Sequence, residues 1–156
     1  MSEIRQKMIT GIASGDRFVV TRTITRQDIV DFARITKDYN PVHFDDRFAK
    51  VKKFDGKISH GLLAASLLTE IGGQIGWLAT EMNFKLKKPV YAGDTICCEL
   101  VITNIDDSGM ACAKAVITNE DKTVVIESVL KGILPGKPEK QIIRSMIAEG
   151  DPSNKI

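Results

Sequence analysis

The sequence predicts an α+β domain in which an antiparallel sheet curls around one buried central helix. Residues 25–71 place apolar side chains at helical spacing, whereas residues from 81 onward alternate with a period of two. This segregation of helices from strands is typical of an α+β domain and not of alternating βαβ units. The segment from Leu62 to Ile71 is apolar almost all round, which indicates a buried helix. A sheet around such a helix keeps open edges, so we expect a homodimer or a higher homo-oligomer.

The length and composition predict one ordinary globular domain. The chain has 156 residues, of which 43% are hydrophobic and 27% charged, and its net charge is only +2. These values indicate neither disorder nor a strongly basic surface, so no nucleic-acid partner is expected. We expect the domain over residues 1–135 and a C-terminal extension over residues 136–156 that is partly helical or frayed.

Cys97, Cys98 and Cys112 are odd in number and have no CxxC spacing, which predicts reduced thiols in a cytoplasmic protein. No apolar run approaches the roughly 20 residues of a membrane span, and the N-terminus has no uninterrupted apolar stretch typical of a leader. We therefore expect a soluble, unprocessed chain without a membrane partner.

A short strand around residues 16–24 precedes the first predicted helix. Thr25 and Asp28 have the spacing of a capping box, so we expect a helix to begin there. It must stop near residues 38–40, because the residue before Pro41 is disfavoured in the helical region.

A second short helix is expected over residues 45–51. Phe44, Phe48 and Val51 recur there at helical spacing, so we expect them to pack the loop onto the domain. The central helix follows. We expect Ser59 to be its N-cap and the pair Gly72 and Gly73 to end it.

The second half of the chain predicts an antiparallel meander. An alternating strand from Glu81 places Met82, Phe84 and Leu86 on one face, and a longer strand does the same with Ile96, Cys98, Leu100 and Ile102. Two further strands are expected over residues 111–117 and 124–132, and one or two amphipathic helical turns in the tail through Ile142, Ile143, Met146 and Ile147.

The stretch "DYNPVH" contains the first candidate site. Asp38 and His43 lie five residues apart across a proline-containing loop, so their side chains can converge on one point. A carboxylate beside an imidazole can hold a water molecule, take its proton and return one, which is general acid–base chemistry. The spacing alone also allows a structural role, in which Asp38 caps the turn and His43 packs beneath Phe44.

The stretch "SHGLL" contains the second candidate site. Ser59, His60 and Gly61 begin the buried helix, where free backbone N–H groups can bind an oxyanion and glycine allows close approach. A purely structural cap is the alternative. Both stretches together match the requirements of proton abstraction α to a thioester.

Other charged residues carry weaker signals. Glu70, the only charge in the apolar helix, is either a catalytic base or a residue at the wet end of the helix. Lys85, Lys87 and Lys88 either meet phosphates at the mouth of a site or are solvated strand residues.

These stretches resemble the MaoC-like dehydratase family, and in particular its R-specific enoyl-CoA hydratases, which have the hot-dog fold. The resemblance runs from about Arg22 to Leu134 and includes an intact D-x-N-P-x-H signature followed by H-G at the start of the central helix. The tail after Gly136 extends beyond a minimal hot-dog domain.

The resemblance implies roles for individual residues. Asp38 and His43 match the pair that activates water, Asn40 matches the asparagine that shapes the loop, and Gly61 matches the residue whose N–H receives the thioester carbonyl. Ser66 and Thr69 match positions of the helix that faces the acyl tunnel.

The implied reaction is the reversible addition of water to a trans-2-enoyl thioester. It needs no metal or redox cofactor, because coenzyme A or acyl carrier protein is part of the substrate. Three alternatives stay open: a hot-dog thioesterase with Glu70 as base, a dehydratase that pairs His60 with Glu70, and a non-catalytic acyl-CoA-binding domain. The sequence does not specify the length of the acyl chain or the thioester carrier.

Overall fold

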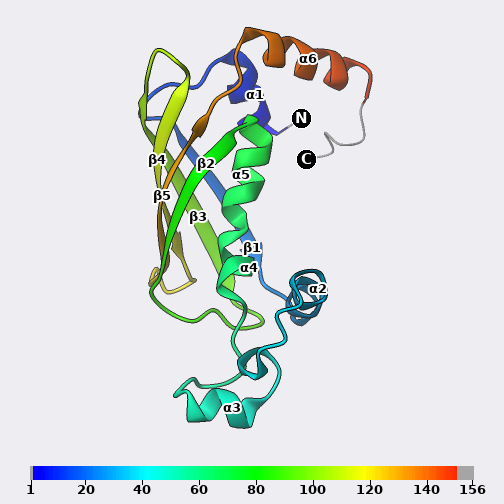
Figure 1. Ribbon diagram of the computed structural model, residues 1–156, viewed down its shortest axis with the longest axis vertical. Coiled ribbons are helices and arrows are strands. Elements are labelled where there is room, and N and C mark those ends of the chain that lie inside the picture. Colours follow the sequence, from blue (N-terminus) through cyan, green and yellow to red (C-terminus); the bar gives the residue numbers. More distant parts are fainter. Residues whose placement is uncertain (1, 151–156) are drawn as a thin grey trace.

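The computed structural model describes residues 2–150 and contains a five-stranded antiparallel sheet in the order β1-β3-β4-β5-β2. The sheet curls along the two helical segments α4 and α5, which stand beside its inner face (Figure 1). Strands β3, β4 and β5 form a meander, as predicted, and β1 pairs with β3. The strand expected to begin the meander, β2, pairs with β5 at the edge of the sheet and not with β3. The strands are β1 Arg17–Thr23, β2 Leu78–Leu86, β3 Thr95–Ile105, β4 Met110–Thr118 and β5 Val124–Ile133.

The core lies between β3 and the central helix. The predicted inward face of β3, made of Ile96, Cys98, Leu100 and Ile102, is fully buried, with 0% of each residue exposed. It belongs to one cluster with the buried apolar side chains of α5. Each large aliphatic side chain in such a core contributes about 1.5–3 kcal/mol through burial. This packing fixes the helix against the sheet.

The central helix differs from the prediction because it is interrupted. It consists of α4 (Gly61–Ala65) and α5 (Leu67–Ile75), divided at Ser66. The Ser66 hydroxyl and N–H both donate to the Leu63 carbonyl oxygen, at 2.6 Å and 3.1 Å, which replaces the regular i−4 pattern. The predicted end at Gly72 and Gly73 is also wrong. The helix continues to Gly76, whose φ of +67° gives the left-handed cap that glycine favours.

Ser59 is not the N-cap of this helix, because His60 occupies that position. The Ser59 N–H donates to the Val90 carbonyl oxygen at 2.7 Å, and its hydroxyl donates to the His60 carbonyl oxygen at 3.3 Å. The N–H therefore holds the segment before α4 against Val90, while the hydroxyl bonds locally to the next residue.

Helix α1 (Glu3–Thr10) was not predicted from the sequence. The Ser2 hydroxyl caps it by accepting from the Arg5 N–H at 3.1 Å, and Met8 is fully buried. Helix α1 packs against α5. Ser2 before Glu3, with Ile4 and Met8 four residues apart, was the available signal.

Strand β2 forms one edge of the sheet and begins at Leu78, three residues before the predicted start. Its predicted apolar face is only partly inward. Phe84 packs against the core, whereas Met82 is 38% and Leu86 61% exposed.

The connecting helices lie at the two ends of the molecule (Figure 1). Helix α2 (Arg26–Thr36) begins with the predicted capping box, and the short helices η1 (Pro41–His43) and α3 (Asp46–Val51) follow. At the opposite end, α6 (Lys137–Ala148) forms the predicted amphipathic helix of the tail, and the expected fraying after it falls outside residues 2–150. None of the helices in this range is long and apolar enough to cross a membrane.

The predicted packing of this segment is only partly confirmed, because Phe44 packs against the core and α3 contacts η1, but Phe48 and Val51 do not face inward. Val51 is 81% exposed and Phe48 38% exposed, and Ala49 is the buried residue of this helix. Spacing identified the helix correctly, but the face of α3 that carries Val51 points to solvent.

Candidate active site

A cavity of about 370 Å³ lies where α4 begins, between the loop that contains η1 and the end of β2. Its lining is mainly apolar with a few converging polar groups, which is the usual composition of a small-molecule site. The polar contributions come from Asn40, His43, Ser59, His60, Lys87 and Lys88, and the apolar ones from Val42, Phe54, Ile58, Ala64, Leu86, Pro89, Val90 and Ile126.

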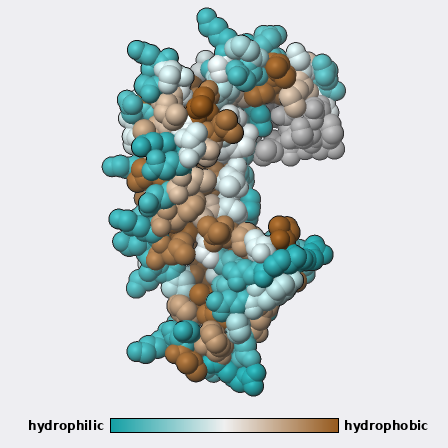
Figure 2. All heavy atoms as spheres, viewed as in Figure 1, coloured by the Kyte–Doolittle hydropathy of each residue, from teal (hydrophilic) through white to brown (hydrophobic). Residues whose placement is uncertain are grey.

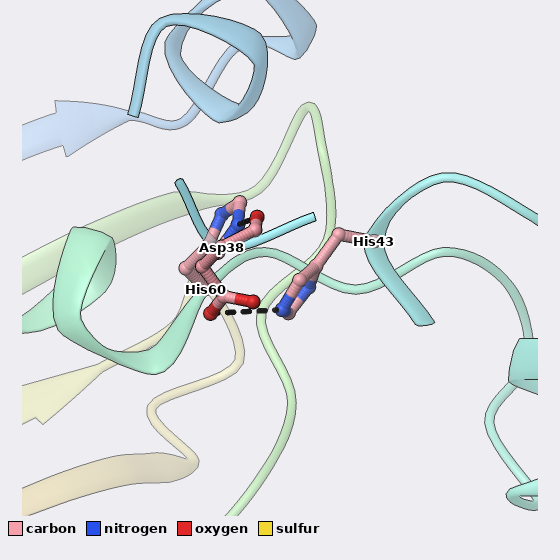
Figure 3. Close-up of side chains that lie close together, drawn as sticks. All are labelled: Asp38, His43 and His60. Atoms are coloured by element: carbon pink, nitrogen blue, oxygen red, sulfur yellow. Dashed lines mark hydrogen bonds and ion pairs between the residues drawn. The ribbon is translucent and has the colours of Figure 1, made fainter. Parts of the chain in front are cut away.

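The predicted convergence of Asp38 and His43 is confirmed. Lys37 is the C-cap of helix α2, and its left-handed conformation, with φ of +62°, turns the chain toward the loop. The Asn40 side chain then caps η1 by accepting from the Val42 N–H at 3.2 Å. As a result, the His43 Nε2 atom lies 3.9 Å from the Asp38 Oδ2 atom (Figure 3). The His43 side chain is buried, whereas half of the Asp38 side chain is exposed.

Hydrogen bonding determines which nitrogen of His43 is basic. The Nδ1 atom lies 2.9 Å from the Ile58 carbonyl oxygen, which can only accept, so Nδ1 carries the proton. The lone pair is therefore on Nε2, the atom that faces Asp38. This orientation makes His43 a base directed at the gap between the two side chains.

The gap between His43 and Asp38 suits a bridging water molecule. At 3.9 Å, the two atoms are too far apart for a direct hydrogen bond. A water molecule at about 2.8 Å from both atoms would form an O···water···N angle of roughly 90°, which is compatible with hydrogen bonds from one water molecule to both atoms.

Burial is the main cause that lowers the pKa of His43 below its ordinary value of 6.5. The neighbouring His60 lowers that pKa further, whereas the Ile58 carbonyl and the Asp38 carboxylate raise it. Overall, the pKa of His43 is lowered, which favours the neutral ring near pH 7. The neutral ring is the form that can accept a proton.

His60 is the residue whose place in the site could not be assigned from the sequence. Its ring centroid lies 3.8 Å from that of His43, and its Nε2 atom lies 3.0 Å from the Asp38 carbonyl oxygen (Figure 3). Since a carbonyl only accepts, Nε2 carries the proton and donates it there. The buried Nδ1 atom has no hydrogen-bond partner among the described residues. His60 therefore holds the backbone of Asp38 and supports the face of the His43 ring.

Asp38, His43 and His60 are also residue types that bind metal ions, and one ligand atom from each lies within 4.8 Å of the others. Ligands that share one zinc ion at 2.0–2.1 Å are roughly 3.4 Å apart in a tetrahedral site. The 3.9 Å gap between His43 and Asp38 is therefore wider than the spacing of a tetrahedral zinc site.

Gly61 begins α4 and lines the cavity. A Cβ atom at this position would lie 2.5 Å from the Leu86 Cδ1 atom, so glycine allows β2 to approach the helix start. The first backbone N–H groups of a helix have no partner within the helix, which leaves the Gly61 N–H suited to bind a carbonyl oxygen.

The other predicted binding residues are not all brought to this cavity. Asn40 lines it. Ser66 and Thr69 do not, and their hydroxyls donate to the Leu63 and Ser66 carbonyl oxygens, at 2.6 Å and 2.7 Å. Both hydroxyls are thus used at the junction of α4 and α5.

Glu70 also lies outside the cavity. Its carboxylate forms an ion pair with Arg22 on β1. This partner accounts for a charge in an otherwise apolar helix and leaves the cavity without a glutamate.

Known proteins resemble this chain over most of its length. A family model described as the MaoC like domain matches residues 11–125. Over 98 residues, the chain is 30% identical to an (R)-specific enoyl-CoA hydratase from Rhodospirillum rubrum, covering 60% of this chain and 68% of that protein. Over 122 residues, it is 32% identical to a mitochondrial 3-hydroxyacyl-acyl-carrier-protein dehydratase from Solanum lycopersicum, covering 73% and 72%.

A solved structure shares the architecture. An (R)-hydratase from A. caviae involved in PHA biosynthesis has a TM-score of 0.75 and 25% identity, and the match covers 80% of this chain and 98% of that one. This likeness confirms the hot-dog fold. The matched family segment contains the loop with Asp38 and His43, the start of α4 and the strands β1 to β4. The chain therefore belongs to the MaoC-like dehydratase family.

Proposed function

We propose that this chain catalyses the reversible addition of water to a trans-2-enoyl thioester, with Asp38 and His43 as the catalytic pair. The observation that carries the proposal is the 3.9 Å gap between the basic nitrogen of His43, which lines a mainly apolar cavity, and the half-exposed carboxylate of Asp38. The hydratases and dehydratases among its relatives support the same reaction class. The R configuration follows the name of the R. rubrum relative.

The proposed mechanism uses the water molecule between the two side chains. Its oxygen bonds to C3 of the enoyl group while a proton passes to the Asp38–His43 pair, and the pair delivers a proton to C2. One C–O bond and one C–H bond form, and the reaction involves no net oxidation or reduction. In reverse, an R-3-hydroxyacyl thioester loses water through the same groups.

The start of α4 has a complementary role in this mechanism. Negative charge develops on the thioester oxygen when water adds to C3, and the Gly61 N–H can donate a hydrogen bond to it. Asn40 maintains the loop through its bonds to the Val42 N–H and, from its own N–H, to the Asp38 carboxylate. We keep Ser66 and Thr69 as residues that shape the helix beside the acyl chain and assign them no chemical step.

We propose that the reaction needs no metal or redox cofactor. The pair supplies both proton transfers, and the addition of water transfers no electrons to an external acceptor. Coenzyme A or an acyl carrier protein enters as part of the substrate.

Crotonyl-CoA provides the direct test. Hydration removes the conjugated double bond, so the enoyl absorbance should decrease while no free thiol is released. Release of free thiol without hydration would instead identify a thioesterase. Tight binding of the acyl-CoA without either reaction would identify a non-catalytic binding domain.

We also propose that the protein is a homodimer formed through β2. This edge strand exposes Leu78, Met82 and Leu86, and Leu62 on α4 is 60% exposed. An exposed apolar edge strand is a template for pairing with a second chain. The opposite edge, β1, has a more polar sequence, RFVVTRT.

We also propose a cytoplasmic location for the protein. Cys97, Cys98 and Cys112 are all free, which suits a reducing compartment. Burial raises the pKa of Cys98 to about 12, so this thiol stays protonated and unreactive.

A further inference from the structure

Helix α3 presents an apolar and basic surface that the reaction itself does not use. We define the α3 surface as Phe48, Lys50, Val51, Lys52 and Lys53. Val51 is 81% exposed, and hydrophobic atoms lie among hydrophilic ones over α3 (Figure 2). An exposed apolar group with a charged rim is typical of a protein-binding site.

The charge of this surface is not neutralised by its neighbours. Asp45 pairs with Arg47, and Asp46 pairs with Lys57. Within residues 2–150, the three lysines of the α3 surface form no ion pair, and Asp55 is the one acid in the 45–57 segment that is likewise unpaired. The surface therefore keeps a net positive charge that favours an acidic partner.

The α3 surface is joined directly to the cavity lining, because Lys53 precedes Phe54 in the chain. The Phe54 N–H donates to the Ala49 carbonyl oxygen at 3.1 Å, which holds the chain after α3 against the helix, and Phe54 lines the cavity. Lys88 also lines it and forms no ion pair among the described residues. A partner bound to α3 would thus lie close to residues that line the cavity.

The composition of the α3 surface favours a protein partner over a nucleotide. Phosphates are bound best by the paired N–H groups of arginine, and adenine needs an aromatic or apolar slot. The one arginine of α3, Arg47, is already paired with Asp45, so the α3 surface offers lysines, and none of its residues lines the cavity. Lysines on flexible stems around an apolar centre suit the carboxylates and apolar side chains of another helix.

We infer that the α3 surface docks an acidic acyl carrier protein, so that the preferred substrate is an enoyl group on the phosphopantetheine arm of that protein. This inference rests on the proposed function and specifies the carrier of its substrate. The acidic protein binds to Val51 and the surrounding lysines, and its arm enters the cavity past Lys88 and Phe54.

The test compares two thioesters that carry the same acyl group. Crotonyl-CoA and a crotonyl-loaded bacterial acyl carrier protein are each hydrated by the wild-type protein and by the variants Val51→Glu and Lys52→Glu/Lys53→Glu. We expect kcat/KM for the carrier-protein substrate to fall about tenfold or more in both variants, because each introduces repulsion against an acidic partner. The kcat/KM for crotonyl-CoA should change less than about twofold. Added salt should lower the wild-type kcat/KM more steeply with the carrier protein than with crotonyl-CoA, which carries fewer charges.

Ile142→Glu is the matched control, since Ile142 is 61% exposed on α6 at the opposite end of the molecule. This variant should leave kcat/KM unchanged for both substrates. Equal losses with both substrates, or no loss with either, would overturn the docking inference and leave the proposed function intact. Failure of the wild-type protein to hydrate either thioester would overturn the proposed function and this inference with it. Thermal unfolding of each variant verifies that the fold is retained.

Discussion

His43 should determine how the activity depends on pH. Its neutral ring is the proposed base, and burial lowers its pKa below 6.5. The kcat/KM for crotonyl-CoA should therefore hold as the pH falls toward 6.5 and decrease only below it, with an acid-limb pKa under 6.5. The stability of the folded protein should also decrease as the pH falls. The unfolded chain takes up this proton at a higher pH than the folded one, so acidification below 6.5 favours unfolding.

His60→Gln provides the control for the pH profile. The neighbouring His60 contributes to lowering the pKa of His43, and its ring also helps to bury that residue. Removal of the ring should shift the acid limb to higher pH, while the glutamine amide can still donate to the Asp38 carbonyl. A limb that stays in place or moves to lower pH would contradict the positioning role of His60.

The contact between Gly61 and Leu86 should affect activity more than stability. An alanine methyl at position 61 would lie 2.5 Å from the Leu86 Cδ1 atom, at the end of a side chain that would have to shift. The displaced leucine would crowd the cavity that it lines. We expect Gly61→Ala to lower kcat/KM about tenfold, because small misplacements near reacting groups are costly.

A double-mutant cycle identifies the cause. Leu86→Ala in the Gly61→Ala background should restore most of the loss. If the two changes are simply additive, the steric account of Gly61 is wrong.

At the scale of elements, the pairing of β2 with β5 depends on Gly132. A Cβ atom there would clash with the Trp77 indole nitrogen and lie 2.5 Å from the Leu78 carbonyl oxygen and 2.8 Å from the Ala79 Cα atom. We expect Gly132→Ala to destabilise the protein by about 1–3 kcal/mol, since backbone atoms cannot move aside. Chemical denaturation measures this change in the free energy of unfolding.

Gly73→Ala is the matched control within the same fold. Gly73 lies inside α5, and a Cβ atom there would have no neighbour within 4 Å. Its replacement by alanine should stabilise the protein by about 0.5–1 kcal/mol. Comparable destabilisation by both variants would show that the clash at Gly132 is not the cause.

Elements with a complete local signal were predictable from the sequence. The capping box of Thr25 and Asp28 located α2, and the period of two located β3, because each pattern directly reports which groups need partners or burial. The break at Ser66 was not predictable. A serine inside a helix can either face solvent or bond the preceding turn, and packing decides between these outcomes.

The candidate site was only partly predictable for a related reason. Asp38 and His43 share one loop, so their convergence follows from local spacing. His60 lies 17 residues after His43, and it reaches that ring because the Ile58 N–H pairs with the Val42 carbonyl oxygen at 3.2 Å and brings the two segments together. Such long-range pairing has no local signature. The exposure of Val51 was missed similarly, because helical spacing does not specify which face is inward.

At the scale of the whole molecule, the exposed apolar side chains of β2 predict a dimer. Met82→Lys places a charge on this edge, and charged residues are the usual means by which edge strands avoid pairing. We expect sedimentation to give the mass of two chains for the wild-type protein and a larger monomer fraction for the variant. A wild-type monomer, or a variant that remains fully dimeric, would argue against β2 as the interface.

The central claim is that Asp38 and His43 together hydrate an enoyl thioester. The most direct test is the rate of crotonyl-CoA hydration by Asp38→Asn and His43→Gln, with Glu70→Gln as control because Glu70 pairs with Arg22 outside the cavity. We expect kcat to fall by about 10² to 10⁴ in each of the first two variants. The control should keep a rate within about twofold of wild type. A near-normal rate for Asp38→Asn, or a large loss for Glu70→Gln alone, would contradict the assignment.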